Sequence, residues 1–420
     1  MNYNEFRGER LKNARLLRAK TITALAEETG ISKQSISLYE NGENKPEYAR
    51  SVALAKALDI PVAFFFSKDS CQTSTPATYF RSLASATKLT RISQSLKLEY
   101  VAKMYEALLE YINFPSLDLP RIEYSGIYNL KDGASLAAMC NEIESVAARL
   151  REYWGIGLGP IGDLQYILES HGIIVTGFDT TIDDIDAFSQ RTIMKDCEVC
   201  FIAVDQGRKP EGRIRFDMAH ELGHLLIHPW SEDIDSLSKE EFKLRETEAN
   251  MFASALLLPR DTFGREISRY PTEIEYYQWL KNHWKVSIQA MMYRTRQLNI
   301  ISGNQFQYMM RQVSKKGWRK AEPGDFPYLL GENIFQGAIE LLLDERVLSG
   351  EEILRLFERY GVSLYPSEIE ELLHIREGTL LSHPFQAKVI QLKPIRKDPA
   401  NDAGDYVKYK RRDTHGIRFV

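Results

Sequence analysis

The sequence predicts a mostly helical protein that contains one small antiparallel β-sheet. Apolar residues recur at helical spacing through most of the chain, and three short β-rich runs lie close together at 172–178, 186–192 and 198–205. A helix pattern of about four turns, 213–228, follows these runs and ends at Pro229. We therefore expect an all-helical N-terminal unit (1–66), a spacer (67–136), an α+β domain (137–300) and a helical C-terminal region (301–420).

Composition excludes several classes of protein. With 420 residues the chain can form two or three domains with real cores. Its formal net charge of −4 gives no overall attraction to nucleic acid, so any contact with DNA needs a local patch of basic residues. We find no apolar run of transmembrane length and no signal-peptide pattern at Met1 to Lys20, and we expect a soluble cytoplasmic protein. Cys197 and Cys200 form C-x-x-C, but no second pair stands near, so reduced thiols are favoured over a zinc site.

The first 66 residues predict a bundle of short helices. Residues 6–19 are amphipathic, and a second helical pattern ends at Gly30, which allows a tight turn. Ser32 can cap the next helix, 33–41, which Gly42 ends. Another helix is expected at 46–58, and the apolar run 60–66 closes the unit.

The run L-A-E-E-T-G-I-S-K-Q-S-I-S-L-Y-E-N-G, with Pro46 after it, resembles the Cro/λ-repressor-type (XRE) helix-turn-helix domain. The resemblance implies that the start of the second helix enters the major groove of a double-stranded DNA operator. The expected contacts are the polar residues of that helix and of the loop after it, Lys33, Gln34, Ser35, Ser37, Asn44 and Lys45. The alternative is a fold kept only for protein contacts, because Glu40, Glu43 and Glu47 crowd this side.

The spacer region begins with a change of composition. Residues 70–78 are rich in Ser, Thr and Pro and are typical of a linker. A long helix is expected at 89–112, and Pro115 and Pro120 break the pattern after it. This helix is a spacer, a homodimer contact or part of a core, and its apolar positions favour the core.

The 213–228 helix contains H-E-x-x-H, with His220, Glu221 and His224. Positions four apart share a helix face, so both imidazoles can hold one metal ion. Two imidazoles and one carboxylate form a zinc site with an open position for water. Such a water becomes acidic enough to attack a peptide carbonyl near neutral pH, and Glu221 lies beside it.

A third ligand is expected from the next strong helix pattern, 245–259. Glu248 lies on the stripe that carries Phe252 and Ala255, where an unpaired charge would be costly and a metal would explain it. Glu246 lies about 200° around that helix and is the weaker candidate. The alternative for either glutamate is a surface salt bridge. His228 lies at the end of the 213–228 helix and is rotated around its axis from His220, which favours a supporting or capping role over ligation.

Residues 212–228 and the segment E-x-E-A-N-x-F-A-x-x-L-L-x-P resemble the ImmA/IrrE family of bacterial zinc metallopeptidases, as do 154–160, 168–175 and 186–189. The resemblance covers about 137–300 and implies a zincin-like, gluzincin-type domain with one Zn²⁺ per chain. It implies His220, His224 and Glu248 as ligands and Glu221 as general base. Metzincins are excluded, because Ile227 and Trp230 stand where that class needs Gly and His.

The sheet runs come before the metal helix, so an edge strand of the sheet could pair with an extended substrate. We expect residues 187–190 to lie on that edge. No function is assigned to 301–420: the basic run 311–324 is typical of a solvated face, and the tail after 399 either touches DNA or is solvated.

The two modules together predict a DNA-binding regulator fused to a zinc endopeptidase that cleaves a helix-turn-helix repressor, in a prophage, mobile element or stress response. Self-cleavage is also open. The alternatives are a transcription factor whose metal site is structural or sensory, and the toxin or defence arm of a regulated pair. The presence of Glu221 favours catalysis, because a purely structural site needs no base there.

Overall fold

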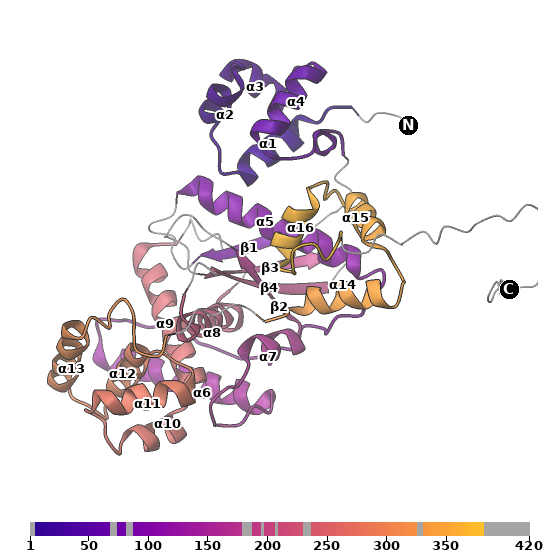
Figure 1. Ribbon diagram of the computed structural model, residues 1–420. Helices are drawn as coiled ribbons and strands as arrows, with labels where there is room; N and C mark the ends of the chain where they lie inside the picture. The colour runs from indigo at the N-terminus through magenta and orange to yellow at the C-terminus, as the bar shows by residue number, and fades with distance from the viewer. Residues whose placement is uncertain are drawn as a thin grey trace, which may run out of the picture. The chain divides into compact units, whose positions relative to one another are not determined.

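The computed structural model of the protein describes residues 5–67, 74–80 (backbone), 87–178, 187–194, 197–205, 209–229, 237–325 and 331–381. Within these ranges the chain is mostly helical and has one four-stranded sheet (Figure 1). The predicted fold class is therefore confirmed in its main features. No helix of the described residues is both long and apolar enough to cross a membrane.

The N-terminal unit forms from short capped helices. These are α1 (Gly8–Leu17), α2 (Ile22–Thr29), α3 (Lys33–Glu40) and α4 (Tyr48–Ala57), followed by a 3-10 turn (Val62–Phe66). Gly30 ends α2 with a φ of 69°, and the Ser32 side chain accepts a bond from the Ser35 backbone N–H. Both local predictions are confirmed.

The sheet consists of β1 (Ser74–Phe80), β2 (Ile173–Phe178), β3 (Ala187–Met194) and β4 (Cys197–Asp205), in the order β1-β3-β4-β2. It is mixed, because β2 pairs parallel with β4 while the other two pairings are antiparallel. Antiparallel pairing therefore predominates, as expected, and the parallel pairing of β2 with β4 is the departure from the predicted antiparallel sheet. The linker expected at 70–78 also differs, since residues 74–78 form part of β1.

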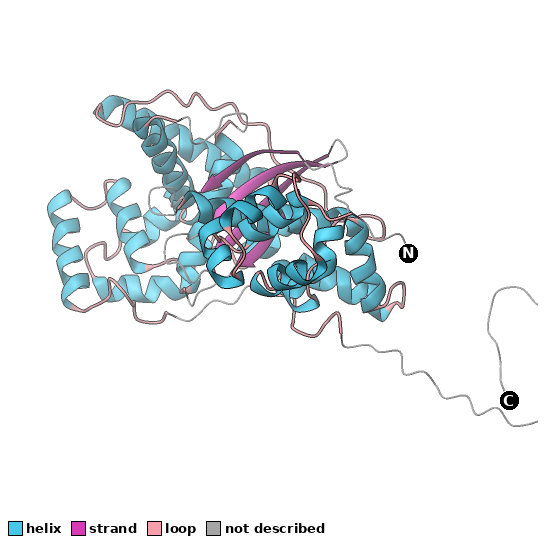
Figure 2. Cartoon of the chain, turned by 90° about the horizontal axis from the view of Figure 1, so that it is seen from above, coloured by secondary structure: helices cyan, strands magenta, loops and turns pink. Residues whose placement is uncertain are grey.

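The sheet separates two hydrophobic cores, and alternate residues of its strands enter each. On β4, Phe201 and Ala203 pack into a core with α5 (Lys88–Leu108), whereas Ile202 and Val204 face the opposite core. The second core is formed with α6 (Gly133–Tyr153), α7 (Leu164–Ser170), α8 (Glu211–Ile227) and α9 (Lys239–Leu257). Helices accordingly lie on both sides of the strands (Figure 2). This burial explains the continuous apolar run of β4.

The core role expected for the 89–112 helix is confirmed. Val101, Ala102 and Met104 of α5 are buried, and the first core also takes in residues of the C-terminal helices. The helices after α9 are α10 (Arg260–Ile267), α11 (Ile274–Trp284), α12 (Ile288–Gln297), α13 (Gly303–Lys315), α14 (Ile334–Asp344), α15 (Gly350–Arg359) and α16 (Pro366–Leu373).

Hydrogen bonds connect the N-terminal unit to the rest of the chain. The Arg10 side chain is fully buried and donates to the Tyr100 hydroxyl (3.3 Å) and to the Gly361 carbonyl (2.7 Å). The Ser93 hydroxyl of α5 donates to the Leu17 carbonyl at the end of α1 (2.6 Å). The first 66 residues therefore contact the rest of the described chain directly. The predicted domain boundaries remain predictions.

Candidate metal centre and DNA-binding helix

The helix α8 brings two imidazoles together in a buried place. His220 and His224 are 0% and 2% exposed, and their Nε2 atoms lie 3.0 Å apart. The run between Pro210 and the irregular residues after Ile227 forms the helix predicted for H-E-x-x-H. Both rings therefore present one nitrogen each to the same point.

The third side chain at this point is Glu246 of α9. Its carboxylate oxygens lie 3.2 Å from the Nε2 atom of His224 and 3.6 Å from that of His220. The three ligand atoms lie within 4.8 Å of one another, as one metal ion requires. Burial alone would raise the pKa of Glu246, but bonds with the two histidines outweigh it and lower the pKa to about 2.

The structure does not bring Glu248, the expected third ligand, to this point. This residue lies on the same helix but points away from the two Nε2 atoms, and its carboxylate contacts His228 and Tyr124 instead. Of the two glutamates, Glu248 is the more deeply buried, with 2% of its side chain exposed against 19% for Glu246.

A glycine allows α8 and α9 to approach closely at this site. A Cβ atom at Gly223 would lie 2.9 Å from Cδ1 of Phe252 and 3.3 Å from Cα of Ala249. Gly223 stands between Glu221 and His224 on α8, and Ala249 lies one turn after Glu246 on α9. The glycine of H-E-L-G-H therefore leaves room for the helix that carries Glu246 to approach α8.

A side chain of the sheet contacts Glu221. It is fully buried, and the Ser189 hydroxyl of β3 donates to its Oε2 atom at 2.7 Å. Ser189 is itself fully buried. The sequence predicted a strand here and a family resemblance at 186–189, but it gave no reason to single out the Ser189 hydroxyl.

A chain of hydrogen bonds runs from His224 away from the site. Its Nδ1 atom lies 2.9 Å from Nδ1 of His228, and Nε2 of His228 lies 3.0 Å from Oε2 of Glu248. The Tyr124 hydroxyl donates to the other oxygen of Glu248 at 2.7 Å. Burial, with the nearby His224 charge adding to it, holds the pKa of His228 well below its usual range. Burial also raises the pKa of Glu248 to about 7, although the bond from Tyr124 opposes this.

Comparison with known families agrees with this arrangement. Residues 168–296 match a peptidase family described as the IrrE N-terminal-like domain, and residues 11–65 match a helix-turn-helix family. The chain joins a helix-turn-helix domain to an IrrE-like peptidase domain. No curated protein matches it. The resemblance inferred from the sequence is thus confirmed, and the α8–α9 region lies in a domain of metallopeptidase type.

The predicted substrate edge of the IrrE-like domain is not an edge. β3 lies between β1 and β4, and β1 pairs with it from Phe188 to Arg191. Ser189, which contacts Glu221, is the backbone partner of Tyr79. The prediction that residues 187–190 form a free edge is wrong, because a segment close after the helix-turn-helix domain pairs there.

The helix-turn-helix domain exposes most of the predicted DNA contacts. Lys33, Gln34, Asn44 and Lys45 are exposed, whereas Ser35 and Ser37 are half-buried. Lys45 forms an exposed ion pair with Glu5, which solvent screens.

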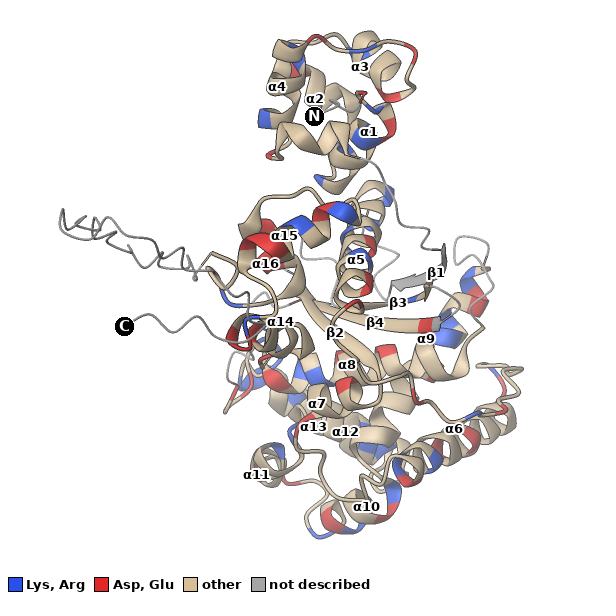
Figure 3. Cartoon of the chain, turned by 90° about the vertical axis from the view of Figure 1, so that its right-hand side faces the viewer, with Lys and Arg blue, Asp and Glu red and all other residues tan. Residues whose placement is uncertain are grey.

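Acidic and basic residues are interspersed on the helices of this domain (Figure 3). One of the three acidic residues that crowd this side is neutralised by an ion pair within the domain: Glu40, the last residue of α3. Glu40 is buried and accepts two bonds from the Arg15 guanidinium, at 2.6 and 2.7 Å. Glu43 and Glu47 remain exposed.

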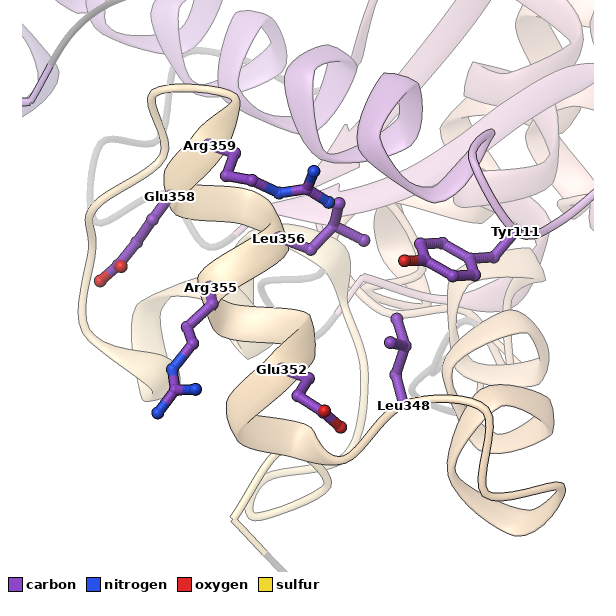
Figure 4. A pocket seen from close by; sticks show the side chains of 7 residues that line it. All are labelled: Tyr111, Leu348, Glu352, Arg355, Leu356, Glu358 and Arg359. Atoms are coloured by element: carbon purple, nitrogen blue, oxygen red, sulfur yellow. The ribbon is translucent and has the colours of Figure 1, made fainter. Parts of the chain in front are cut away.

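A separate pocket lies outside both sites. It has a volume of about 560 Å³, and Tyr111 and Leu348 face Leu356 of α15 across it (Figure 4). Two arginines and two glutamates of α15 also line it, and Arg359 pairs with Glu110 nearby. It shares no residue with the His220–His224–Glu246 group.

Proposed function

We propose that this protein is a DNA-binding transcriptional regulator whose peptidase domain is a zinc-dependent endopeptidase that cleaves a helix-turn-helix repressor. The observation that supports the enzymatic half is the convergence of His220, His224 and Glu246, with Glu221 next to His220 on the same helix. The two family matches support the combination of DNA binding and a peptidase in one chain.

The residues fit a zinc ion better than a hard cation. Two imidazole nitrogens and one carboxylate are the donor set of catalytic zinc sites, which leave a position open. Mg²⁺ and Ca²⁺ prefer all-oxygen sites, so the two histidines disfavour them. We assign His220, His224 and Glu246 as the ligands in place of the set with Glu248. Zinc at this point would supply a Lewis acid that polarises the scissile carbonyl and acidifies the attacking water.

The chain's own groups then carry the proton. Glu221 accepts a proton from the attacking water and returns it to the leaving amine, as a general base that becomes a general acid. The hydroxyl of Ser189 donates to Oε2 of Glu221 and so helps to orient this carboxylate. Burial of the histidines and of Glu221 keeps the charges of this step away from bulk water.

Substitution of Glu221 by Gln tests this proposal. Glu221→Gln keeps the side-chain shape, so the protein should retain about one zinc per chain while proteolysis falls by about a hundredfold or more. The measurement is metal content together with cleavage of a small helix-turn-helix protein encoded beside this chain. Glu211→Gln, at the start of the same helix, is the matched control and should leave both unchanged.

Two results would contradict the enzymatic reading. Undiminished cleavage by Glu221→Gln would mean that another group is the base. Zinc-replete protein that cleaves neither the neighbouring repressor nor its own chain would favour a structural or sensory metal site.

The DNA-binding half rests on the exposed start of α3. Lys33 suits guanine and Gln34 suits adenine in the major groove, and both side chains are exposed. Lys33→Ala with Gln34→Ala should abolish the sequence-specific footprint on the operator and leave zinc content unchanged. Lys56→Ala, an exposed lysine on α4, should keep the footprint. If the double variant still protects the same operator site, the assignment of α3 as the recognition helix is wrong.

A further inference from the structure

We propose that His228, Glu248 and Tyr124 form a positioning relay that holds His224 in the one tautomer and orientation able to bind metal. This inference rests on the proposed function, because it takes the Nε2 atom of His224 as a metal ligand. None of the three relay residues is a ligand itself. They act through His224 by consecutive hydrogen bonds.

The contacts of His224 assign the direction of the first bond. Its Nε2 atom faces Glu246 and the Nε2 atom of His220, so the lone pair for metal has to be there. The ring is neutral when it binds a metal, and its single proton therefore lies on Nδ1. That proton faces Nδ1 of His228 at 2.9 Å, and His228 has to accept it.

The same reasoning fixes the rest of the chain. A neutral His228 that accepts at Nδ1 carries its proton on Nε2, which lies 3.0 Å from Oε2 of Glu248. Glu248 accepts this proton as a carboxylate and accepts the Tyr124 hydroxyl proton at its other oxygen. Every donor meets an acceptor in this arrangement. In the reversed arrangement, the proton of His224 would lie on Nε2 and block the metal.

Because the relay residues are buried, a hydrogen bond that is lost within the relay is not replaced by one to bulk water. His228 and Glu248 are 6% and 1% exposed, so a mismatched donor or acceptor there would not be satisfied by bulk water. Ligating histidines usually donate their other N–H to a carboxylate, a backbone carbonyl or water, and such partners raise the basicity of the ligand. Here the carboxylate lies one imidazole further away, on the helix that also carries Glu246. One helix thus supplies both a proposed ligand and the support of another.

The experiment measures metal affinity and tautomer, and it does not depend on catalysis. Co²⁺ is the probe, and its dissociation constant is obtained by competition with a chelator. Glu248→Gln should weaken Co²⁺ binding by about ten- to a hundredfold, the usual effect of removing an outer partner of a ligand. Tyr124→Phe removes one hydroxyl and should weaken binding in the same direction by a smaller factor. The ¹⁵N shifts of Zn²⁺-loaded wild type should place the His224 proton on Nδ1, where it faces His228, and Glu248→Gln should shift these resonances.

Tyr128→Phe is the matched control. Tyr128 lies in the same irregular segment as Tyr124, its hydroxyl also bonds to a glutamate, Glu142, and neither residue contacts His228 in the described bonds. Its Co²⁺ affinity should equal that of wild type.

Unchanged affinity and tautomer in both Glu248→Gln and Tyr124→Phe would overturn the relay while leaving the metal site intact. Failure of the metal site itself is a different result, in which wild type binds no Co²⁺. That result would contradict the proposed function and the relay together, and the wild-type affinity distinguishes it from the first result.

Discussion

Substitution of Gly223 by alanine tests whether close packing of α8 on α9 sets the metal geometry. The added Cβ would lie 2.9 Å from Cδ1 of Phe252 and 3.3 Å from Cα of Ala249. Carbon atoms pack best at about 3.5–4.0 Å, so α9 or the Phe252 ring has to move by about 0.5 to 1 Å. Phe252 is fully buried, which leaves its ring little room to turn away.

The displacement is large on the scale of a metal site. Ligand distances are tolerated within about 0.2 Å, and Glu246 lies one turn from Ala249 on the helix that moves. We therefore expect Co²⁺ affinity to fall by about tenfold or more. Overpacking costs about 1–3 kcal/mol, while alanine gains about 1 kcal/mol over glycine in a helix. The metal-free variant should be less stable by up to about 2 kcal/mol.

The assay combines urea denaturation of metal-free protein with the chelator competition for Co²⁺. Gly337→Ala is the matched control, because Gly337 lies inside α14 and a Cβ there meets nothing within 4 Å. That variant should gain about 0.5–1 kcal/mol and leave Co²⁺ binding unchanged. If Gly223→Ala is stabilised like the control and binds Co²⁺ as wild type does, the close approach does not set the site.

Two further predictions follow from buried charges. Burial raises the pKa of Glu169 to about 8, against bonds from the Ile334 backbone and from Gln165. The folded state then binds one more proton than the unfolded state between about pH 4.5 and 8, so wild type should lose stability as pH rises through that window. Glu169→Gln should lose less in the same range in urea denaturation, and parallel curves would contradict the shift. Arg15→Met leaves Glu40 buried without its guanidinium and should destabilise the N-terminal helices by about 3 kcal/mol, seen as hydrogen exchange of α1 and α3 about a hundredfold faster. Adding Glu40→Leu should recover most of this loss, and a double variant no better than Arg15→Met would show that the charge is not the cause.

Local features of the site could be predicted from the sequence. His220 and His224 share one face of a helix because they are four residues apart. The caps at Ser32 and Gly30 depend on two or three neighbouring residues. The strands at 172–178 and 198–205 were identifiable because their β-rich runs are short and bounded.

Features that depend on distant contacts could not be predicted in this way. Which face of α9 meets α8 depends on contacts between the two helices, such as Phe252 and Ala249 against Gly223, and the buried Glu248 has its partners in His228 and Tyr124. Tyr124 lies in an irregular segment, and no local pattern marks it. The pairing of β1 with β3 joins residues more than 100 positions apart, in a segment whose composition indicates a linker. The burial of Glu40 depends on Arg15, which lies on another helix.

The buried Arg10 has a consequence for how the protein is made. Its guanidinium donates to the carbonyl of Gly361, 351 residues further along the chain. At about 5–20 residues per second, a ribosome reaches Gly361 about 20–70 s after Arg10. Until then this donor has to stay hydrated, so α1 cannot complete its packing when it first emerges. The contact between α1 and the residues around Gly361 can therefore form only after both segments have been synthesised.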